Sequence, residues 1–337
     1  MEKIMAVLTG ERQYAERFCE YVNRKNNLIL TAVPFSDPHE CAAFSEKHRI
    51  EVLLADGEII SGGMDVKNGI NAGRIIGLTE GSPFGAALAE ENARYRYVSK
   101  YQSADGLMRE VMDSCRDMEM VRVSEHLGRP VRIIGVYSPA GGWGKSAFSM
   151  TLCSMLSRSR KTLYLTLEEF SGLEGLTGEN YSSCLSDAIY HMKQGSLNAQ
   201  RICSMTYSYC GIEYIPPIRY AEDRNAVSGE DYVRLINTIL KNSLYEVIVV
   251  EMGRFADEAA DIMEICGKVY IPASERYAEN IKVNDFLNYL NSAERNDLAD
   301  KMIRVTLPPA DYSGSVPYME ALIYGEMGDL VRELREV

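Results

Sequence analysis

Short apolar runs alternate with amphipathic stretches along the first third of the chain. The apolar runs have the length of buried strands, and the amphipathic stretches have the period of helices. The predicted strands are residues 4–8, 28–33, 52–55, 75–78 and 95–99, and the predicted helices are residues 11–26, 38–48 and 105–116. Such alternation predicts a parallel sheet with helices on both faces, and five strands fit a small flavodoxin-like unit.

A second and longer alternating pattern follows from residue 131 onward. Its predicted strands are residues 131–137, 162–167, 211–215, 247–250, 268–271 and 302–307, and its predicted helices are residues 145–157, 184–194, 229–242, 257–265, 278–291 and 318–336. Between the two patterns, residues 116–130 are charged and lack a clear apolar face, which predicts a linker. The expected fold class is therefore α/β, with two doubly wound parallel-sheet domains at residues 1–117 and 131–337 and a linker at 118–130.

Composition narrows the classes of function that this fold could serve. The 337 residues are enough for two cores, and 48 acidic against 36 basic side chains give a formal charge of −12. An acidic chain argues against DNA as a partner, because non-specific DNA binding needs a basic surface. Eight cysteines without a C-x-x-C pair, and four histidines, favour a reducing compartment over a disulfide framework or a structural zinc site.

The apolar runs also bear on where the protein is found. No run approaches the roughly 18 residues that a membrane span needs, and the first residues lack the pattern of a signal peptide. We therefore expect a cytoplasmic protein without integral membrane insertion.

A glycine-rich segment separates the predicted strand at 131–137 from the helix at 145–157. Glycines let backbone N–H groups approach phosphate oxygens, and the start of a helix favours an anion. Lys145 matches the P-loop lysine of the β- and γ-phosphates, and Ser146 matches the hydroxyl that binds Mg²⁺. The strict pattern G-x-x-x-x-G-K-S fails at its first position, which is Pro139. The sequence thus predicts an ATP site formed by Gly141, Gly142, Trp143, Gly144, Lys145, Ser146 and Ala147.

Residues 138–146, SPAGGWGKS, resemble the deviant Walker A loop K-G-G-x-G-K-[ST] of the MinD/ParA family of ATPases. The plan of two domains resembles the CpaE/TadZ branch, which has an N-terminal receiver-like domain and serves in assembly of Flp-type (tight adherence) pili. This resemblance implies a homodimer switched by ATP and Mg²⁺ that positions the pilus secretion machinery, with recruitment to the membrane or the cell pole through partner proteins.

The same resemblance assigns roles to single residues, and several positions depart from it. Ala140 stands where the family has its signature lysine, and Thr166 stands where it has the first acid of a D-x-D motif. Glu168 takes the place of the acid that orients the attacking water, and Glu251 takes that of the acid that holds Mg²⁺. Pro308 lies in the loop that cradles adenine. These departures predict ATP binding with slow or absent hydrolysis.

The first domain resembles a response-regulator receiver. Asp56 ends its third predicted strand at the phosphoacceptor position, Thr79 ends the fourth and Lys100 follows the fifth. The acidic pair that would hold Mg²⁺ after the first strand is missing, since residues 8–10 read LTG, and Tyr101 replaces the usual proline. We expect a pseudo-receiver used for docking or dimerisation, and the alternative is a switch phosphorylated at Asp56.

Four other functions share the second fold. A DNA-partition ATPase needs a basic surface, and a membrane-cycling division regulator needs a basic amphipathic C-terminal helix. Residues 318–337 are apolar at regular spacing but carry five acids and two arginines, which favours a helix packed on the core. An iron-protein reductase needs cluster cysteines in loops after strands, and a bacterial tyrosine kinase needs a tyrosine-rich tail that this sequence lacks.

Overall fold

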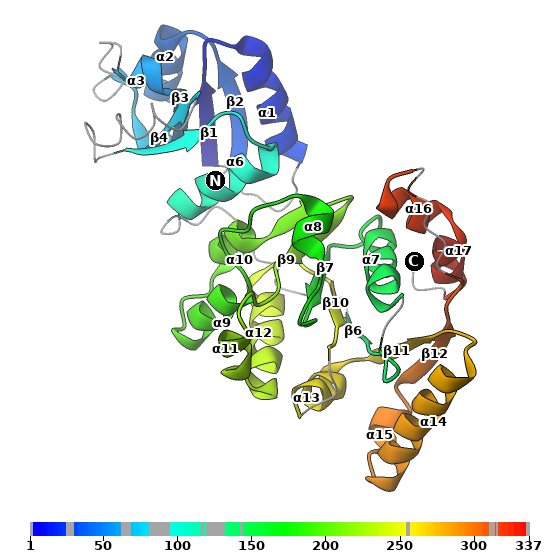
Figure 1. Ribbon diagram of the computed structural model, residues 1–337. Helices are drawn as coiled ribbons and strands as arrows, with labels where there is room; N and C mark the ends of the chain where they lie inside the picture. Colours follow the sequence, from blue (N-terminus) through cyan, green and yellow to red (C-terminus); the bar gives the residue numbers. More distant parts are fainter. Residues whose placement is uncertain are drawn as a thin grey trace. The chain divides into compact units, whose positions relative to one another are not determined.

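The computed structural model describes residues 3–24, 30–61, 69–80, 95–115, 118, 132–141, 144–253, 257–309, 314 and 316–334. Contacts divide the chain into two compact units. The first combines Met1–Val123 with Asn198–Ser204, and the second combines Ser124–Leu197 with Met205–Val337. Each unit has its own sheet (Figure 1). The predicted linker at 118–130 lies, apart from residue 118, outside the described residues, so its boundaries stay predictions.

The first unit contains a five-stranded sheet in the order β2-β1-β3-β4-β5, and each described pairing is parallel. This is the flavodoxin-like strand order that the alternating pattern predicts. Its elements are β1 Lys3–Leu8, α1 Arg12–Arg24, β2 Leu30–Phe35, α2 Pro38–Lys47, β3 Ile50–Asp56, α3 Gly57–Ser61, β4 Ala72–Thr79, β5 Arg96–Ser99 and α6 Ala104–Ser114.

Strand β1 explains why this sheet has helices on both faces. Successive side chains of a strand point to opposite faces, and all of them are apolar from Met5 to Leu8. Met5 and Val7 pack into a core with α1 and α6, whereas Ala6 and Leu8 pack into a core with α2. A strand that is buried on both faces is typical of parallel sheets.

The second unit contains a seven-stranded sheet in the order β12-β11-β6-β10-β7-β9-β8. The predicted parallel arrangement is confirmed for its other strands, and an edge strand that was not predicted, β8, pairs antiparallel with β9 through a tight hairpin. From residue 132 the elements are β6 Arg132–Val136, α7 Lys145–Leu156, β7 Thr162–Thr166, α8 Leu173–Thr177, α9 Leu185–Lys193, α10 Ala199–Met205, β8 Tyr207–Tyr209, β9 Ile212–Ile215, α11 Ala221–Asn225, α12 Gly229–Asn242, β10 Val247–Glu251, α13 Asp257–Ile265, β11 Lys268–Ala273, α14 Tyr277–Ser292, α15 Asn296–Ala299, β12 Met302–Thr306, α16 Tyr318–Tyr324 and α17 Glu326–Glu333. Of these, α10 belongs, apart from Met205, to the first unit.

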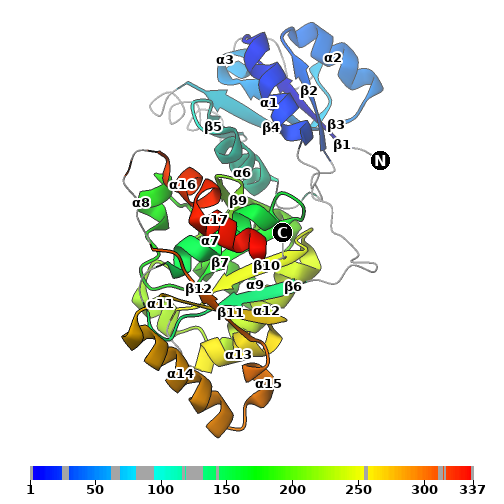
Figure 2. The same cartoon turned by 90° about the vertical axis from the view of Figure 1, so that its right-hand side faces the viewer.

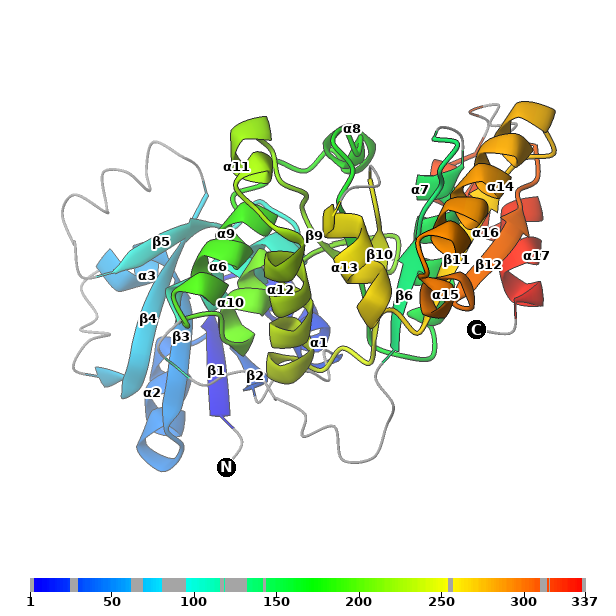
Figure 3. The ribbon, with the colours of Figure 1, turned by 90° about the horizontal axis from the view of Figure 1, so that it is seen from below.

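Helices cover both faces of this second sheet. On one face, α16 and α17 pack on α7 (Figure 2), and their Met319, Met327 and Val331 share a core with Phe148. On the opposite face lie α12, α13 and α14 (Figure 3). The C-terminal stretch packs on the core as predicted, but it forms two helices that meet at Gly325. Within the described residues, no helix has the length and apolar character to cross a bilayer.

The strand order places three loops side by side. β10 lies between β6 and β7, so the carboxyl ends of these parallel strands meet at one edge of the sheet. The order of strands reverses at this point. From β6 the chain continues to β7 on one side, and from β10 it continues to β11 on the other side. Ligands of open α/β sheets bind at such a switch point.

Candidate functional site

The predicted phosphate loop runs from the end of β6 into the first turn of α7. Gly144 precedes the helix with a φ of 95°, and Gly141 has a φ of 66°. The positive φ favours glycine there, and a Cβ atom on Gly144 would lie 2.4 Å from Cδ1 of Leu307 and displace that side chain. Gly142 and Trp143 lie outside the described residues, and their predicted contact with phosphate stays a prediction.

Lys145 is the first residue of α7, and its side chain is buried. Its Nζ donates a hydrogen bond of 2.5 Å to the carbonyl oxygen of Met252, directly after β10. The same ammonium forms an ion pair with Glu168, two residues after the end of β7. The structure therefore joins the lysine and the acid that the sequence placed at one ATP site.

Ser146 and Glu251 form the second contact of the site. Ser146 Oγ donates a hydrogen bond of 2.6 Å to Glu251 Oε1, and the phenol of Tyr164 donates to Glu251 Oε2. Glu251 is fully buried at the end of β10. Burial raises its pKa above the ordinary value of 4.5, although hydrogen bonds from Ser146, Tyr164 and Thr166 act in the opposite direction. Burial and the adjacent Glu251 also raise the pKa of Tyr164.

The donor set at this point suits Mg²⁺. A serine hydroxyl and a carboxylate oxygen are hard ligands of the kind that Mg²⁺ prefers, and they already lie within hydrogen-bond distance of one another. Among the described residues, no cluster of three or more His, Cys, Asp or Glu side chains could hold a metal ion. One hydroxyl and one acid fit the usual arrangement in which Mg²⁺ keeps water and substrate phosphates as further ligands.

The remaining predicted residues lie around this centre. Ala147 is buried in the first turn of α7, and Thr166 is fully buried. Thr166 Oγ1 accepts a hydrogen bond of 3.3 Å from the Glu168 amide. Pro308 is half-buried and follows Leu307, whose side chain faces Gly144. The Ala140 carbonyl, at the position of the missing signature lysine, lies 3.5 Å from Lys282 Nζ.

Four residues at this site were not predicted from the sequence. They are Tyr164, Met252, Arg224 and Lys282. Tyr164 belongs to a strand that is buried at every position, so the sequence does not separate a phenol beside the acid from one that only fills the core. The other three depend on which loops the topology brings together, and no local pattern records that.

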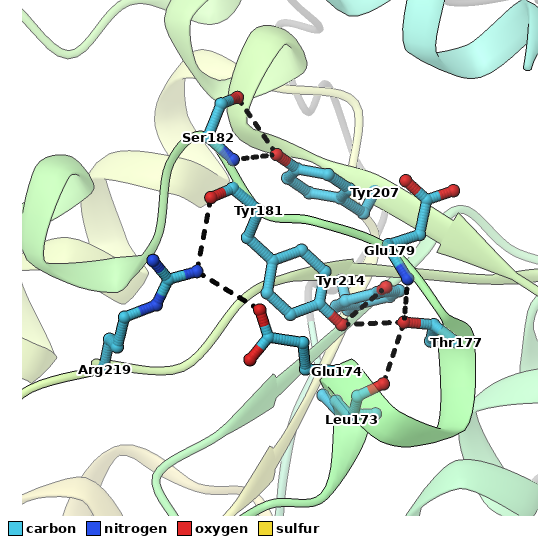
Figure 4. A network of polar contacts seen from close by, with 9 residues as sticks. All are labelled: Leu173, Glu174, Thr177, Glu179, Tyr181, Ser182, Tyr207, Tyr214 and Arg219. Atoms are coloured by element: carbon cyan, nitrogen blue, oxygen red, sulfur yellow. Dashed lines mark hydrogen bonds and ion pairs between the residues drawn. The ribbon is translucent and has the colours of Figure 1, made fainter. Parts of the chain in front are cut away.

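The segment between β7 and α9, which we call the β7 connection (residues 167–184), is held by hydrogen bonds to the edge strand β8 and its neighbour β9. The Tyr181 hydroxyl forms a hydrogen bond of 3.1 Å with the hydroxyl of Tyr214 in β9. It forms another of 3.0 Å with Thr177 Oγ1 (Figure 4). Tyr207 of β8 accepts a hydrogen bond of 2.8 Å from the Ser182 amide. The far half of the β7 connection is thus held by side chains of two strands.

The carboxyl edge of the first sheet forms a separate polar cluster. Asp56 Oδ2 accepts hydrogen bonds of 2.6 Å from Thr9 Oγ1 and 3.0 Å from the Gly10 amide. The buried Lys100 ammonium lies 2.7 Å from Glu11 Oε1 and 3.5 Å from Asp56 Oδ1. Burial lowers the pKa of Lys100, but Glu11 and Asp56 outweigh it, and the pKa lies above its ordinary value.

This cluster contains two of the three receiver-like residues in direct contact, Asp56 and Lys100. The third, Thr79, is buried beside them, and its carbonyl accepts a hydrogen bond of 2.8 Å from the Lys100 amide. Thr9, in the stretch 8–10 where the resemblance to a receiver would require an acid for Mg²⁺, donates a hydrogen bond to Asp56 instead. Asp56 is thus paired with the chain's own donors, and whether it accepts a phosphoryl group stays a prediction.

No protein-family model matches the chain, and no curated protein matches it. Solved structures with a similar arrangement include a ParA family ATPase from Chlorobium tepidum TLS, with 16% identity, a TM-score of 0.48, and coverage of 59% of this chain and 82% of that one. A putative plasmid partition protein from Borrelia burgdorferi B31 bound to AMPPNP has 15% identity, a TM-score of 0.41, and coverage of 62% and 100%. The MinC:MinD complex of Aquifex aeolicus has 12% identity, a TM-score of 0.42, and coverage of 60% and 78%. At these values the likeness assigns neither ligand nor activity to this chain.

Proposed function

We propose that the second unit binds ATP together with Mg²⁺ and is a nucleotide-dependent switch of the MinD/ParA type. The observation that carries this proposal is the meeting of Lys145, Ser146 and Glu251 where β6 and β10 end. A lysine, a hydroxyl and a buried acid at the N-terminus of a helix are the parts that hold a triphosphate and its metal.

Different groups of the chain would bind the phosphates, the Mg²⁺ ion and the adenine. Backbone N–H groups at the start of α7 would receive the phosphates, and the Lys145 ammonium would balance their charge. Ser146 and Glu251 would hold Mg²⁺, which when bound neutralises charge on the β- and γ-phosphate oxygens. Pro308 would line the adenine side, as the resemblance implies, and the residue before it, Leu307, packs against Gly144.

Hydrolysis is proposed to be slow or absent. Ala140 has no cation to offer a partner's nucleotide, and Thr166 is directed at Glu251 rather than supplying an acid. Glu168 has the chemistry to orient a water molecule, but it is one methylene longer than aspartate, and small displacements of a catalytic group are costly.

The cellular role follows from the resemblance stated for the sequence. We propose an ATP-dependent homodimer in the cytoplasm that localises or assembles the secretion machinery of a Flp-type pilus through protein partners. Two α/β units in one chain, the first with a receiver-like strand order, support this role. A DNA-partition or membrane-cycling role is less well supported, because the net charge is −12 and the apolar residues of α16 and α17 are used in the core.

Nucleotide binding is tested with the purified full chain and a fluorescent ATP analogue, in Mg²⁺ and in EDTA. We expect Mg²⁺-dependent binding that is lost in Lys145→Ala and loses its Mg²⁺ dependence in Ser146→Ala. Equal binding by the native chain and Lys145→Ala would reject the site. Turnover as fast as that of active partition ATPases would reject slow hydrolysis.

The pilus role is tested separately. Pilin, prepilin-peptidase and secretion-ATPase genes next to this one would support the pilus role.

A further inference from the structure

The amine that should meet phosphate is already engaged by a carboxylate. Lys145 has 7% of its side chain exposed, and Glu168, its ion-pair partner, has 28% exposed. A pair this sheltered from water is screened less than a surface pair. A phosphate oxygen that approaches Lys145 must therefore compete with the Glu168 carboxylate for the same ammonium, and both are negatively charged.

An arginine holds the backbone beneath that carboxylate. Nη2 of Arg224, in α11, lies 3.4 Å from the carbonyl oxygen of Glu168 and 3.2 Å from that of Glu169. It also lies 3.5 Å from the carbonyl oxygen of Ile218, just after β9. A charged donor shared by three carbonyl oxygens connects the loop after β9 to the near end of the β7 connection.

Two further contacts limit how far this end of the β7 connection can move. The Leu167 amide donates a hydrogen bond of 2.8 Å to the Glu251 carbonyl. A Cβ on Gly253 would lie 2.8 Å from the Leu167 carbonyl oxygen, so the backbone rests directly on that glycine. Glu168 is thus aimed at Lys145 by neighbours on both sides of its backbone.

A second arginine holds the far end of the same connection. Arg219 Nη2 lies 3.4 Å from Glu174 Oε1 and 3.3 Å from the Tyr181 carbonyl oxygen (Figure 4). It has no contact with Glu168 among the hydrogen bonds of the described residues. Arg219 and Arg224 come from one short stretch of chain, and they therefore form a natural pair of test and control.

We infer that Glu168 takes the place of phosphate on Lys145 in the nucleotide-free chain, and that Arg224 is the positioning residue that holds it there. ATP then binds only to the fraction of molecules in which Glu168 has left Lys145, so the apparent affinity is lowered by that fraction. The inference rests on the proposed ATP site, and it gives Glu168 a role in nucleotide entry besides the water-orienting role that the resemblance implies.

The first test compares Glu168→Gln with Glu169→Gln, which removes an exposed carboxylate next to it and keeps the carbonyl that Arg224 contacts. With the fluorescent ATP analogue in Mg²⁺, Glu168→Gln should bind roughly tenfold more tightly, the change expected from a competing contact of about 1.4 kcal/mol. Glu169→Gln should stay within about twofold of the native chain. Unchanged affinity with lower turnover in Glu168→Gln would overturn the inference and leave only the water-orienting role.

The second test addresses Arg224. Arg224→Ala should also bind the analogue more tightly, by about threefold or more, whereas Arg219→Ala should not. A residue that merely supports the fold would weaken binding when removed, so the sign of the change separates the two roles. Arg224→Lys, which keeps a cationic donor, should lie nearer the native value, and it carries the test if Arg224→Ala does not fold. Weaker or unchanged binding in both Arg224 variants would overturn the positioning role.

A double variant shows whether Arg224 acts through Glu168. In the Glu168→Gln background, Arg224→Ala should have no further effect on affinity, because the group that it positions is gone. Additive effects would contradict that link. Failure of the ATP site itself looks different: the native chain, Glu168→Gln and Lys145→Ala would then all fail to bind the analogue.

Discussion

At the scale of single residues, the most unusual group is the fully buried carboxylate of Glu251. Its oxygens accept hydrogen bonds from Ser146 and Tyr164, and its negative charge lies in the interior at the start of the phosphate-loop helix. The pKa of Glu251 is nevertheless raised above 4.5, so the effect of burial outweighs the effect of these hydrogen bonds. A buried acid with a raised pKa beside a glycine-rich turn and a lysine is a functional-site signal, since burying such a group costs stability.

The raised pKa predicts a pH dependence of stability. Between 4.5 and the raised value, the unfolded chain has released the Glu251 proton while the folded chain keeps it, so this group's contribution to the free energy of unfolding falls as pH rises. Glu251→Gln does not titrate, and its free energy of unfolding relative to the native chain should increase across the same window. Urea unfolding at a series of pH values in EDTA measures this difference, and a difference that is flat with pH would contradict the prediction.

Tyr164→Phe tests the phenol that supports Glu251. The variant removes one donor from a buried carboxylate, which should lower the free energy of unfolding by about 1–3 kcal/mol and raise the pKa of Glu251 further. Tyr190→Phe is the control, because Tyr190 is 61% exposed and its loss of a hydroxyl should change stability by less than about 0.5 kcal/mol. Equal stability of the two variants would show that the Tyr164 hydrogen bond contributes nothing.

Site residues that belong to a sequence motif could be predicted, and site residues outside any motif could not. Lys145, Ser146 and Glu251 follow from a glycine-rich turn and from an apolar run that ends in an acid, and the structure brings all three together. Arg224 belongs to a polar stretch that looks like any solvated helix. Its contact with the β7 connection depends on two strands being neighbours, and that is a property of the sheet order rather than of local sequence.

At the scale of elements, the apolar runs predicted the strands well because parallel strands are buried on both faces. Their helices were also predicted where they span three turns or more. The short helices α3, α8, α10, α11 and α15 were missed, since fewer than eight residues give too little periodicity to detect. The edge strand β8 has three residues and was missed for the same reason. The extended backbone of Gly325 divides the predicted C-terminal helix, and glycine suits this break because a Cβ there would lie 2.5 Å from the Ala321 carbonyl oxygen.

Two glycines of the phosphate loop give a matched test of how α7 begins. Gly144→Ala places a Cβ 2.4 Å from Leu307 in a backbone with φ of 95°, whereas Gly141→Ala has φ of 66° and nothing within 4 Å. Gly141→Ala should cost about 1–2 kcal/mol from backbone conformation alone, and Gly144→Ala should cost more by about 1–3 kcal/mol of overpacking. Urea unfolding checks the order, and equal losses would show that Leu307 moves aside freely.

At the scale of the whole molecule, two α/β units with different polar sites share one chain. The second carries the proposed nucleotide site, and the first carries a carboxylate that is already paired with the chain's own donors. The fold class was predictable from alternation alone, because βα repeats leave few topologies open. The glycine-rich turn before α7 also predicts that the second carboxyl edge, rather than the first, takes nucleotide, and this stays a prediction.

The polar cluster of the first unit predicts that Asp56 does not accept a phosphoryl group. Incubation of the full chain with a small phosphodonor and Mg²⁺ should add no phosphoryl group at Asp56, because Thr9 stands where an acid would bind the metal. Intact-mass measurement checks this, with Asp56→Asn as the control for other sites. A phosphoryl adduct on the native chain that is absent from Asp56→Asn would make the first unit a true switch.

The first unit is built from two separate segments of the chain, and this affects the order of its synthesis. This unit includes Asn198–Ser204, so its set of residues is complete only 81 positions after Val123 (204 minus 123). Chains grow at about 5–20 residues per second, so roughly 4–16 seconds of translation separate the first sheet from its last segment. On the ribosome the first unit is therefore completed only after 74 residues of the second, Ser124–Leu197 (197 minus 123), have been made, and the second is completed later, at Val337.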